Sequence, residues 1–307
     1  MLTSLLFRPS IPALLSPENI TQGNSVINLV SSFSSLIGPV IGGTLFGFFG
    51  IMPILYISVV CFLASAIMEI FIHIPFEKKE THGSIFSIGF HDLKDSFHYM
   101  RREEPLIIKI SLIIAAINLF LSSLMIIGLP IMVTQILTFD PDTAIRLYGY
   151  AEGFIAAGSL AGGILAGVMS KKLKAKNSYK SIIYCALTLI PIGLAIAVPM
   201  NPVISYIILV ISCFVMMLFA SLFSVQMMAY LQMIVPGEML GKVISCAMCI
   251  GMCASPLGQA IYGGLFQIFA SNMYIVIFAS AMITCLISIL SKKTFKQMSV
   301  ILEKFKI

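Results

Sequence analysis

Charged residues are scarce in this chain of 307 residues. Lys, Arg, Asp and Glu together make up 10% of the sequence, whereas a soluble domain carries roughly 25%. Hydrophobic residues make up 59%, and the mean hydropathy is +1.02. A chain with so few polar side chains cannot cover a folded surface that faces water. We therefore expect an integral membrane protein whose solvent is lipid.

The chain also lacks the sequence patterns of an enzyme. It contains no HExxH zinc motif, no phosphate-binding loop and no cluster of acidic residues and histidine within its apolar segments. His82, His91 and His98 fall in the one long polar segment, where we expect solvated side chains. The sequence therefore predicts no enzymatic activity, no catalytic residue and no cofactor.

Metal ligands and nucleic-acid contacts are not indicated either. All 7 cysteines lie inside apolar runs without metal-ligand spacing, a pattern typical of small packing residues. The formal net charge is +6, but the basic residues fall in short loops between apolar runs. We expect neither a bound metal nor a nucleic-acid partner.

The apolar runs are long enough to cross a bilayer, which takes ~20 helical residues. The polar segment at 75–105 contains Leu93, Phe97 and Met100 on one helical face of 91–100, which predicts an amphipathic helix. The fold class is therefore all-α, with eight transmembrane helices. The predicted spans are residues 24–49, 54–74, 106–136, 147–169, 181–198, 203–233, 243–269 and 274–290.

The distribution of basic residues predicts the orientation. With eight spans, both ends of the chain lie on one side of the membrane. Of the 19 Lys and Arg residues, only Arg146 falls on the opposite side. Because cytoplasmic loops carry the excess of Lys and Arg, we expect both ends in the cytoplasm.

The first span contains residues that are unfavourable in a soluble helix. Gly38, Pro39, Gly42, Gly43 and Gly47 stand within one apolar run. Each glycine costs ~1 kcal/mol of helix propensity, and proline removes a backbone donor. In a membrane, neighbouring helices re-satisfy the backbone and small residues permit close approach. We expect a bent and tightly packed helix.

A pattern similar to that of this span recurs late in the chain. Pro17 precedes Pro39 in the same way that Pro236 precedes Pro256, and a glycine cluster follows each helical proline. Two homologous halves of six helices would explain the pattern, since six spans separate the pair. Four helices would then be absent before Met1. Two unrelated proline-kinked helices are the alternative.

Five segments of the chain form a recognisable series. They are the loop at 7–24, the GPVIGG stretch at 38–43, the linker at 92–99, the loop signature at 162–172 and the pattern at 231–243. In this order and spacing they resemble the major facilitator superfamily, specifically the drug-efflux branch that contains macrolide and enterobactin exporters, with GPVIGG similar to its antiporter motif and Lys242 where arginine is usual.

The resemblance also implies a domain organisation. In family order the eight spans are helices 5 to 12. The resemblance implies an N-terminal remnant at 1–75, a cytoplasmic linker at 76–105, a six-helix bundle at 106–292 and a cytoplasmic tail at 293–307.

The resemblance also implies a function. It indicates a multi-pass protein of the plasma membrane that exports hydrophobic drug-like or secondary-metabolite molecules, such as macrolides, by proton-coupled alternating access. The implied partners are the lipid bilayer, a small hydrophobic substrate, protons and a chain that supplies the missing N-terminal half. The alternative is a truncated, transport-inactive fragment, or a membrane scaffold or receptor of the same fold.

Rocking of two bundles requires helices that slide closely, which small residues one turn apart permit. The resemblance makes the first and fourth spans face each other across the two halves. The predicted interface residues are Gly38, Pro39, Gly42, Gly43, Gly47, Gly158, Gly162, Gly163 and Gly167.

Intramembrane charge points to coupling, because it is costly to keep. Glu152 lies between glycines of the fourth span, where desolvation favours its protonated form and suits proton exchange, although a solvated helix end is the equal alternative. Glu69 is a second candidate, with snorkelling to the interface as the favoured interpretation. The candidate cavity residues are Asn118, Gln226 and Gln232.

Overall fold

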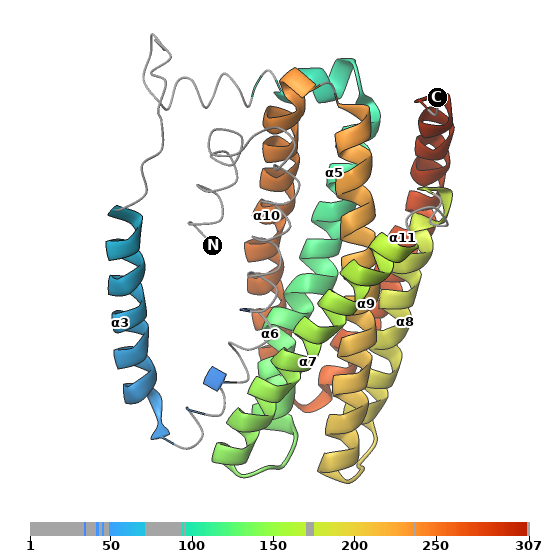
Figure 1. The fold of residues 1–307 in the computed structure, drawn as a ribbon. Helices are drawn as coiled ribbons and strands as arrows, with labels where there is room; N and C mark the ends of the chain where they lie inside the picture. Colours follow the sequence, from blue (N-terminus) through green and yellow to red (C-terminus); the bar gives the residue numbers. More distant parts are fainter. Residues whose placement is uncertain are drawn as a thin grey trace. The chain divides into compact units, whose positions relative to one another are not determined.

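The computed structural model describes residues 34, 41, 42, 45, 49–70, 94, 96–169, 175–235 and 237–305, and the fold is all-helical as expected. Figure 1 shows the arrangement. The elements are α3 (Ile51–Ile70), α5 (Pro105–Ile117), η2 (Asn118–Ser122), α6 (Ser123–Ile131), η3 (Met132–Ile136), α7 (Pro141–Val168), η4 (Ala175–Asn177), α8 (Ser178–Ala197), α9 (Pro202–Ile234), α10 (Gly237–Ile268), η5 (Ala270–Asn272) and α11 (Met273–Phe305).

The chain divides into two compact units. The first comprises residues 1–82 and 140–156, and the second comprises residues 83–139 and 157–307. Helix α7 is continuous and contributes to both units. Within the second unit, α8 packs against α9 and α11, while α10 packs against α5, η2 and α6.

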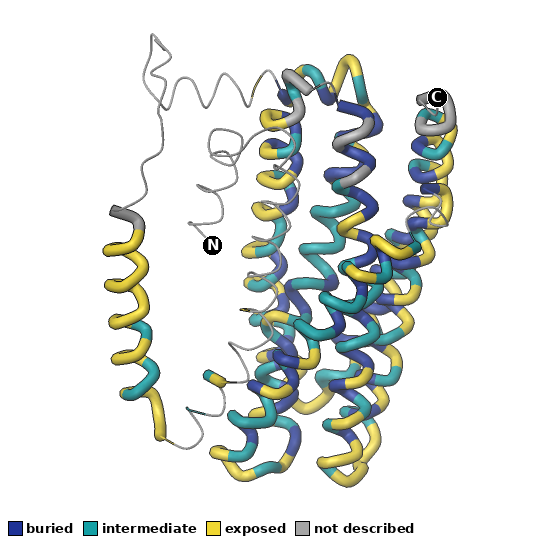
Figure 2. The backbone as a smooth tube through the Cα atoms, viewed as in Figure 1, coloured by how far each residue is buried: buried dark blue, intermediate teal, exposed yellow. Residues whose placement is uncertain are grey.

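Seven helical segments within the described residues are long and apolar enough to cross a membrane. They correspond to the second to eighth predicted spans, while the span predicted at 24–49 falls largely outside the described residues. In the second unit, the outer faces of the helices expose apolar side chains such as Ile211, Met282 and Leu286. Figure 2 shows this alternation of exposed and buried sides along α8 to α11, as expected for helices that face lipid.

Helix α7 begins several residues before the span predicted at 147–169. Pro141 occupies the start of the helix, where its missing N–H costs nothing. The Asp140 carboxylate accepts a hydrogen bond of 2.9 Å from the Thr143 backbone N–H. This contact, together with the Thr143 side chain, holds the pKa of Asp140 below its ordinary value. The residues that precede the predicted span, 141–146, therefore form the first turns of the helix itself.

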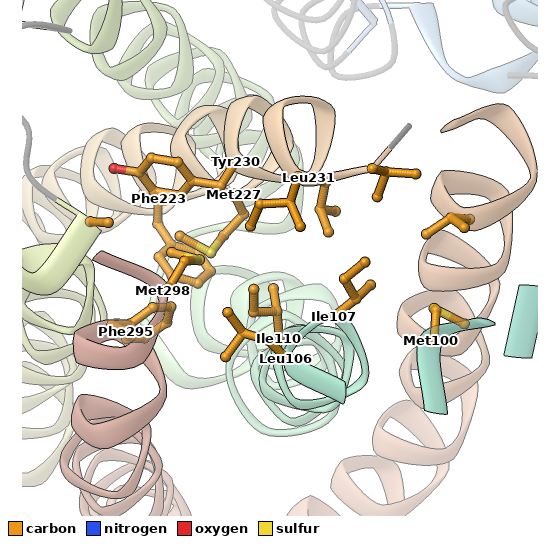
Figure 3. Packing of buried hydrophobic residues seen from close by; sticks show 14 of the residues in the cluster. Met100, Leu106, Ile107, Ile110, Phe223, Met227, Tyr230, Leu231, Phe295 and Met298 are labelled. Carbon is orange, nitrogen blue, oxygen red and sulfur yellow. The ribbon is translucent and has the colours of Figure 1, made fainter. Parts of the chain in front are cut away.

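A hydrophobic cluster closes one end of the second unit. Its aromatic centre is formed by Phe223 and Phe295, whose rings meet edge to face with centroids 5.9 Å apart. Because the cluster draws side chains from α5, α9 and α11, it fixes the ends of these helices relative to one another. Figure 3 shows its members Met100, Leu106, Ile107, Ile110, Phe223, Met227, Tyr230, Leu231, Phe295 and Met298.

This cluster explains two departures from the sequence predictions. Met100 of the linker is buried in it, whereas Phe97 is 45% exposed, so these two residues do not share the buried face as predicted. Ser96 is buried one turn before Met100, and the inward face passes through this pair. In the tail, Phe295 and Met298 are fully buried, which carries α11 as a helix to Phe305.

Candidate functional site

Two of the predicted interface glycines pack directly against a neighbouring helix. Gly158 and Gly162 lie one turn apart on α7, and both are buried. A Cβ atom at Gly158 would overlap the backbone of Phe214, and one at Gly162 would overlap the backbone of Leu218. The partner is α9, so glycine is required here because two helix backbones come into contact.

The other predicted interface glycines have different surroundings. A Cβ at Gly163 would lie 3.8 Å from the Ser221 hydroxyl, an ordinary contact, and one at Gly42 or Gly167 would meet nothing within 4 Å. Gly38, Pro39, Gly43 and Gly47 fall outside the described residues. The seam between the first and fourth spans therefore stays a prediction.

The carboxylate predicted for proton exchange has a partner on its own helix. Glu152 is half-buried in α7. Tyr148, one turn earlier on the same helix, lies close enough to interact with it. The second candidate, Glu69, lies near the end of α3, and its side chain is outside the described residues.

The span at 105–136 contains two irregular turns that the sequence patterns did not predict. The turns η2 and η3 are π-helical, and Pro130 stands between them inside α6. A π turn inserts one residue into the helix, and such turns occur frequently at functional sites. The available sequence signals were Pro130 and the polar group of Asn118, Ser122 and Ser123 within an apolar run.

The first π turn is tied to α10 by side-chain hydrogen bonds. The Asn118 amide nitrogen donates to the Gly251 carbonyl at 3.1 Å, and its oxygen accepts from Ser122 at 3.2 Å. The Ser123 hydroxyl lies 2.7 Å from the Asn118 carbonyl and 3.0 Å from the Ser255 carbonyl. Both ends of the candidate cavity residue Asn118 are therefore engaged within the protein.

A second set of hydroxyl groups surrounds the Phe120 carbonyl of the same turn. The Tyr262 hydroxyl lies 2.7 Å from this carbonyl oxygen, and the Ser280 hydroxyl lies 2.9 Å from it. The two hydroxyls are 2.9 Å apart. In lipid, a backbone carbonyl that leaves the helical ladder needs such donors. Helices α10 and α11 thus stabilise the irregular turn.

The same contact depends on a glycine of α10. A Cβ at Gly258 would overlap the Leu119 carbonyl and the Ser123 hydroxyl. Beside it, a crevice of about 180 Å³ opens between α10 and α11. Phe120, Tyr262 and Ser280 contribute to its wall, and the remaining lining is mostly apolar. The arrangement is a helix with an irregular turn whose polar groups are bonded to α10 and α11.

The two glutamines predicted for the cavity lie on α9. Gln226 is buried, and its side-chain oxygen accepts a hydrogen bond of 3.1 Å from the Ser178 hydroxyl of α8. Gln232 is part of α9, but its side chain is outside the described residues. Within the part of the chain that the structure describes, no group of three or more His, Cys, Asp or Glu residues could hold a metal ion.

Several long apolar helices, closely packed through glycines and interrupted at one polar turn, define a polytopic helical membrane protein. The sequence profile described as Major Facilitator Superfamily matches residues 6–216. The chain belongs to the major facilitator superfamily, whose members are secondary transporters and not enzymes. No curated protein and no solved structure matches the chain significantly.

Proposed function

We propose that this protein is a proton-coupled exporter of small hydrophobic molecules in the plasma membrane, with both chain ends in the cytoplasm. Family membership supplies the general mechanism, in which two helical bundles alternate access to a site near the bilayer midplane. The resemblance of the GPVIGG stretch at 38–43 to an antiporter motif favours export over import. The chemistry of the substrate follows from the resemblance to macrolide exporters.

The observation that carries the coupling proposal is the placement of Glu152. A carboxylate inside a membrane-spanning helix is costly and marks an ion or proton pathway by default. Glu152 is half-buried, and Tyr148 lies beside it one turn away. Tyr148 would thereby orient the carboxylate and compensate it when it is ionised. Release of a proton from Glu152 would then accompany one half of the transport cycle.

Asn118 is our candidate for a residue that hydrogen-bonds the substrate. It is half-buried at the irregular turn of the span, whereas Gln226 is buried and bonded to Ser178. Apolar sites for small molecules use a few placed polar groups to orient the ligand. An amide that exchanges the Gly251 carbonyl for a substrate acceptor would serve this purpose.

Proteoliposomes that contain the full chain and an internal pH dye test the coupling. With an imposed proton gradient we expect uptake of a macrolide, and macrolide addition should release protons. In Glu152→Gln both signals should disappear, because the side chain keeps its shape and hydrogen bonding but cannot exchange a proton. The unfolding temperature of the variant in detergent should match that of the wild type.

Glu152→Asp provides the matched control, because it retains a carboxylate one methylene shorter. We expect it to keep part of the macrolide-driven proton release. Unchanged proton release in Glu152→Gln would refute the role of Glu152. Absence of macrolide movement in the wild type under every gradient would refute the export proposal itself.

A further inference from the structure

Five lysines gather where α8 begins and where α11 leaves its apolar part. The residues are Lys176 in η4, Lys180 in α8, and Lys292, Lys293 and Lys296 in α11. All five side chains are exposed. The sequences of η4 and α8 contain no acidic residue, and that of α11 contains none before Glu303. This group is called the lysine cluster below, and no acidic residue stands between its members in the sequences of these elements.

The packing of α8 on α11 fixes the lysine cluster at one level of the bundle. The Ser288 hydroxyl of α11 donates to the Tyr179 carbonyl of α8 at 2.6 Å. One turn later, the Lys292 ammonium group lies 5.6 Å from the centroid of the Tyr179 ring, a cation–π contact. Lys180 directly follows Tyr179 in the chain. Figure 1 shows α8 and α11 side by side in this region.

The next turns of both helices expose apolar side chains instead of lysines. Leu286, Ile289 and Leu290 are exposed on α11, and Tyr184 and Leu187 are exposed on α8. The exposed surface therefore changes from apolar to basic at the start of α8 and at the matching level of α11. This change marks the boundary between hydrocarbon and headgroups, where lysines extend their ammonium groups to the polar layer.

We propose that the lysine cluster and the adjoining apolar surface of α8 and α11 bind an anionic phospholipid. The phosphate would lie among the ammonium groups, and an acyl chain would lie along Leu286, Leu290 and Tyr184. The apolar surface next to the charge favours a lipid over free phosphate. Clusters of lysine beside a transmembrane helix attract anionic lipids in this way. The proposal does not depend on the transported substrate or on the coupling ion.

The linker end of α5 shows the contrasting case. Arg101 and Arg102 are exposed there, but Glu103 and Glu104 follow them directly in the chain. Charges of both signs within one turn neutralise each other at the distance of a lipid headgroup. Together with Lys94 and Lys109, this region supplies four exposed basic residues whose removal serves as a control, with no predicted lipid selectivity.

Native mass spectrometry of the full chain in mild non-ionic detergent tests the proposal. We expect phosphatidylglycerol to bind at least ~10-fold more tightly than phosphatidylcholine with the same acyl chains, because each lysine near an anionic headgroup contributes about fivefold in affinity. The selectivity should disappear when four lysines of the lysine cluster are replaced. This variant, called the patch variant, carries Lys180→Gln, Lys292→Gln, Lys293→Gln and Lys296→Gln.

The control variant removes an equal positive charge and should keep the selectivity. It carries Lys94→Gln, Arg101→Gln, Arg102→Gln and Lys109→Gln. Replacement of the same four lysines of the lysine cluster by arginine should also keep the selectivity, because the positive charge is retained. This comparison separates the effect of lost charge from the effect of lost folding. Lipid-free unfolding temperatures check that all variants fold, and the double variant Lys292→Gln/Lys293→Gln replaces the patch variant if that one does not.

Three results would overturn the proposal. The first is equal binding of phosphatidylglycerol and phosphatidylcholine to the wild type. The second is a loss of selectivity in the control variant as large as that in the patch variant. The third is complete displacement of phosphatidylglycerol by inorganic phosphate at the same concentration, which would assign the cluster to free phosphate.

Discussion

The adjacent glycines Gly162 and Gly163 of α7 should respond in opposite ways to the same added methyl group. In Gly162→Ala, the new Cβ would lie 2.9 Å from the Leu218 carbonyl carbon and 3.0 Å from the Leu218 Cα, with the carbonyl oxygen closer still. Carbon atoms in contact prefer roughly 3.5–4.0 Å. All three clashing atoms belong to the α9 backbone and cannot rotate away, so α7 and α9 must separate.

The size of the effect follows from this separation. Relieving a distance of 2.9 Å needs a shift of about 0.5–1 Å, which already forfeits a quarter to a half of the dispersion energy of neighbouring contacts. Overpacking of this kind costs about 1–3 kcal/mol, and the better helix propensity of alanine returns ~1 kcal/mol. We therefore expect Gly162→Ala to lower the free energy of unfolding by up to about 2 kcal/mol.

Gly163→Ala is the matched control. Its Cβ would lie 3.8 Å from the Ser221 hydroxyl, an ordinary contact, so the gain in helix propensity should appear alone. We expect an increase of up to ~1 kcal/mol in the free energy of unfolding. The assay is a denaturant titration with SDS in mixed micelles, followed by circular dichroism. Equal stabilities of the two variants, or a more harmful effect at Gly163, would refute the close packing of α7 on α9.

Two further predictions concern hydrogen bonds. Tyr262→Phe should lower the free energy of unfolding by only about 0.6 kcal/mol, because Ser280 still reaches the Phe120 carbonyl at 2.9 Å. The double variant Tyr262→Phe/Ser280→Ala should lower it by about 1–3 kcal/mol. If the loss in the double variant equals the sum of the two single losses in the same micelle titration, the two hydroxyls do not share this carbonyl. At the start of α7, Asp140 has a lowered pKa in the folded state, so its stabilising contribution is complete above its unfolded pKa of about 3.9 and is lost as the pH falls through the lower folded value. Asp140→Asn keeps an acceptor for Thr143 but does not titrate, so we expect it to flatten the loss of stability below about pH 4, and an unchanged acid profile in this variant would speak against the helix cap.

Hydropathy was sufficient to place the seven spans that fall within the described residues, because membrane crossing imposes a simple requirement of length and apolarity. The span predicted at 203–233, for example, lies within α9, which begins at Pro202 and ends at Ile234. Boundaries shifted where local contacts decide. The Asp140 cap started α7 earlier, and burial of Phe295 extended α11 into the lysine-rich tail.

For the candidate sites too, the sequence predicted which residues matter but not their contacts. The presence of small residues on α7 could be recognised from their spacing, but their partners could not. Gly162 and Gly163 are equivalent in sequence terms, yet a rotation of about 100° around the helix directs one to the α9 backbone and leaves the other without a close contact. Asn118 was recognisable as a polar residue within an apolar run, whereas the π turn that begins with it was not.

The amino-acid sequence by itself determined the class of protein, the positions of the spans that fall within the described residues, and the family, because these depend on composition, run length and motif order. Only the tertiary structure decided which glycines touch a helix, how the Phe120 carbonyl is satisfied, and that lysines distant in sequence form one cluster beside Tyr179. These features depend on the rotation and axial register of one helix against another. A change of one residue in register alters them without altering hydropathy.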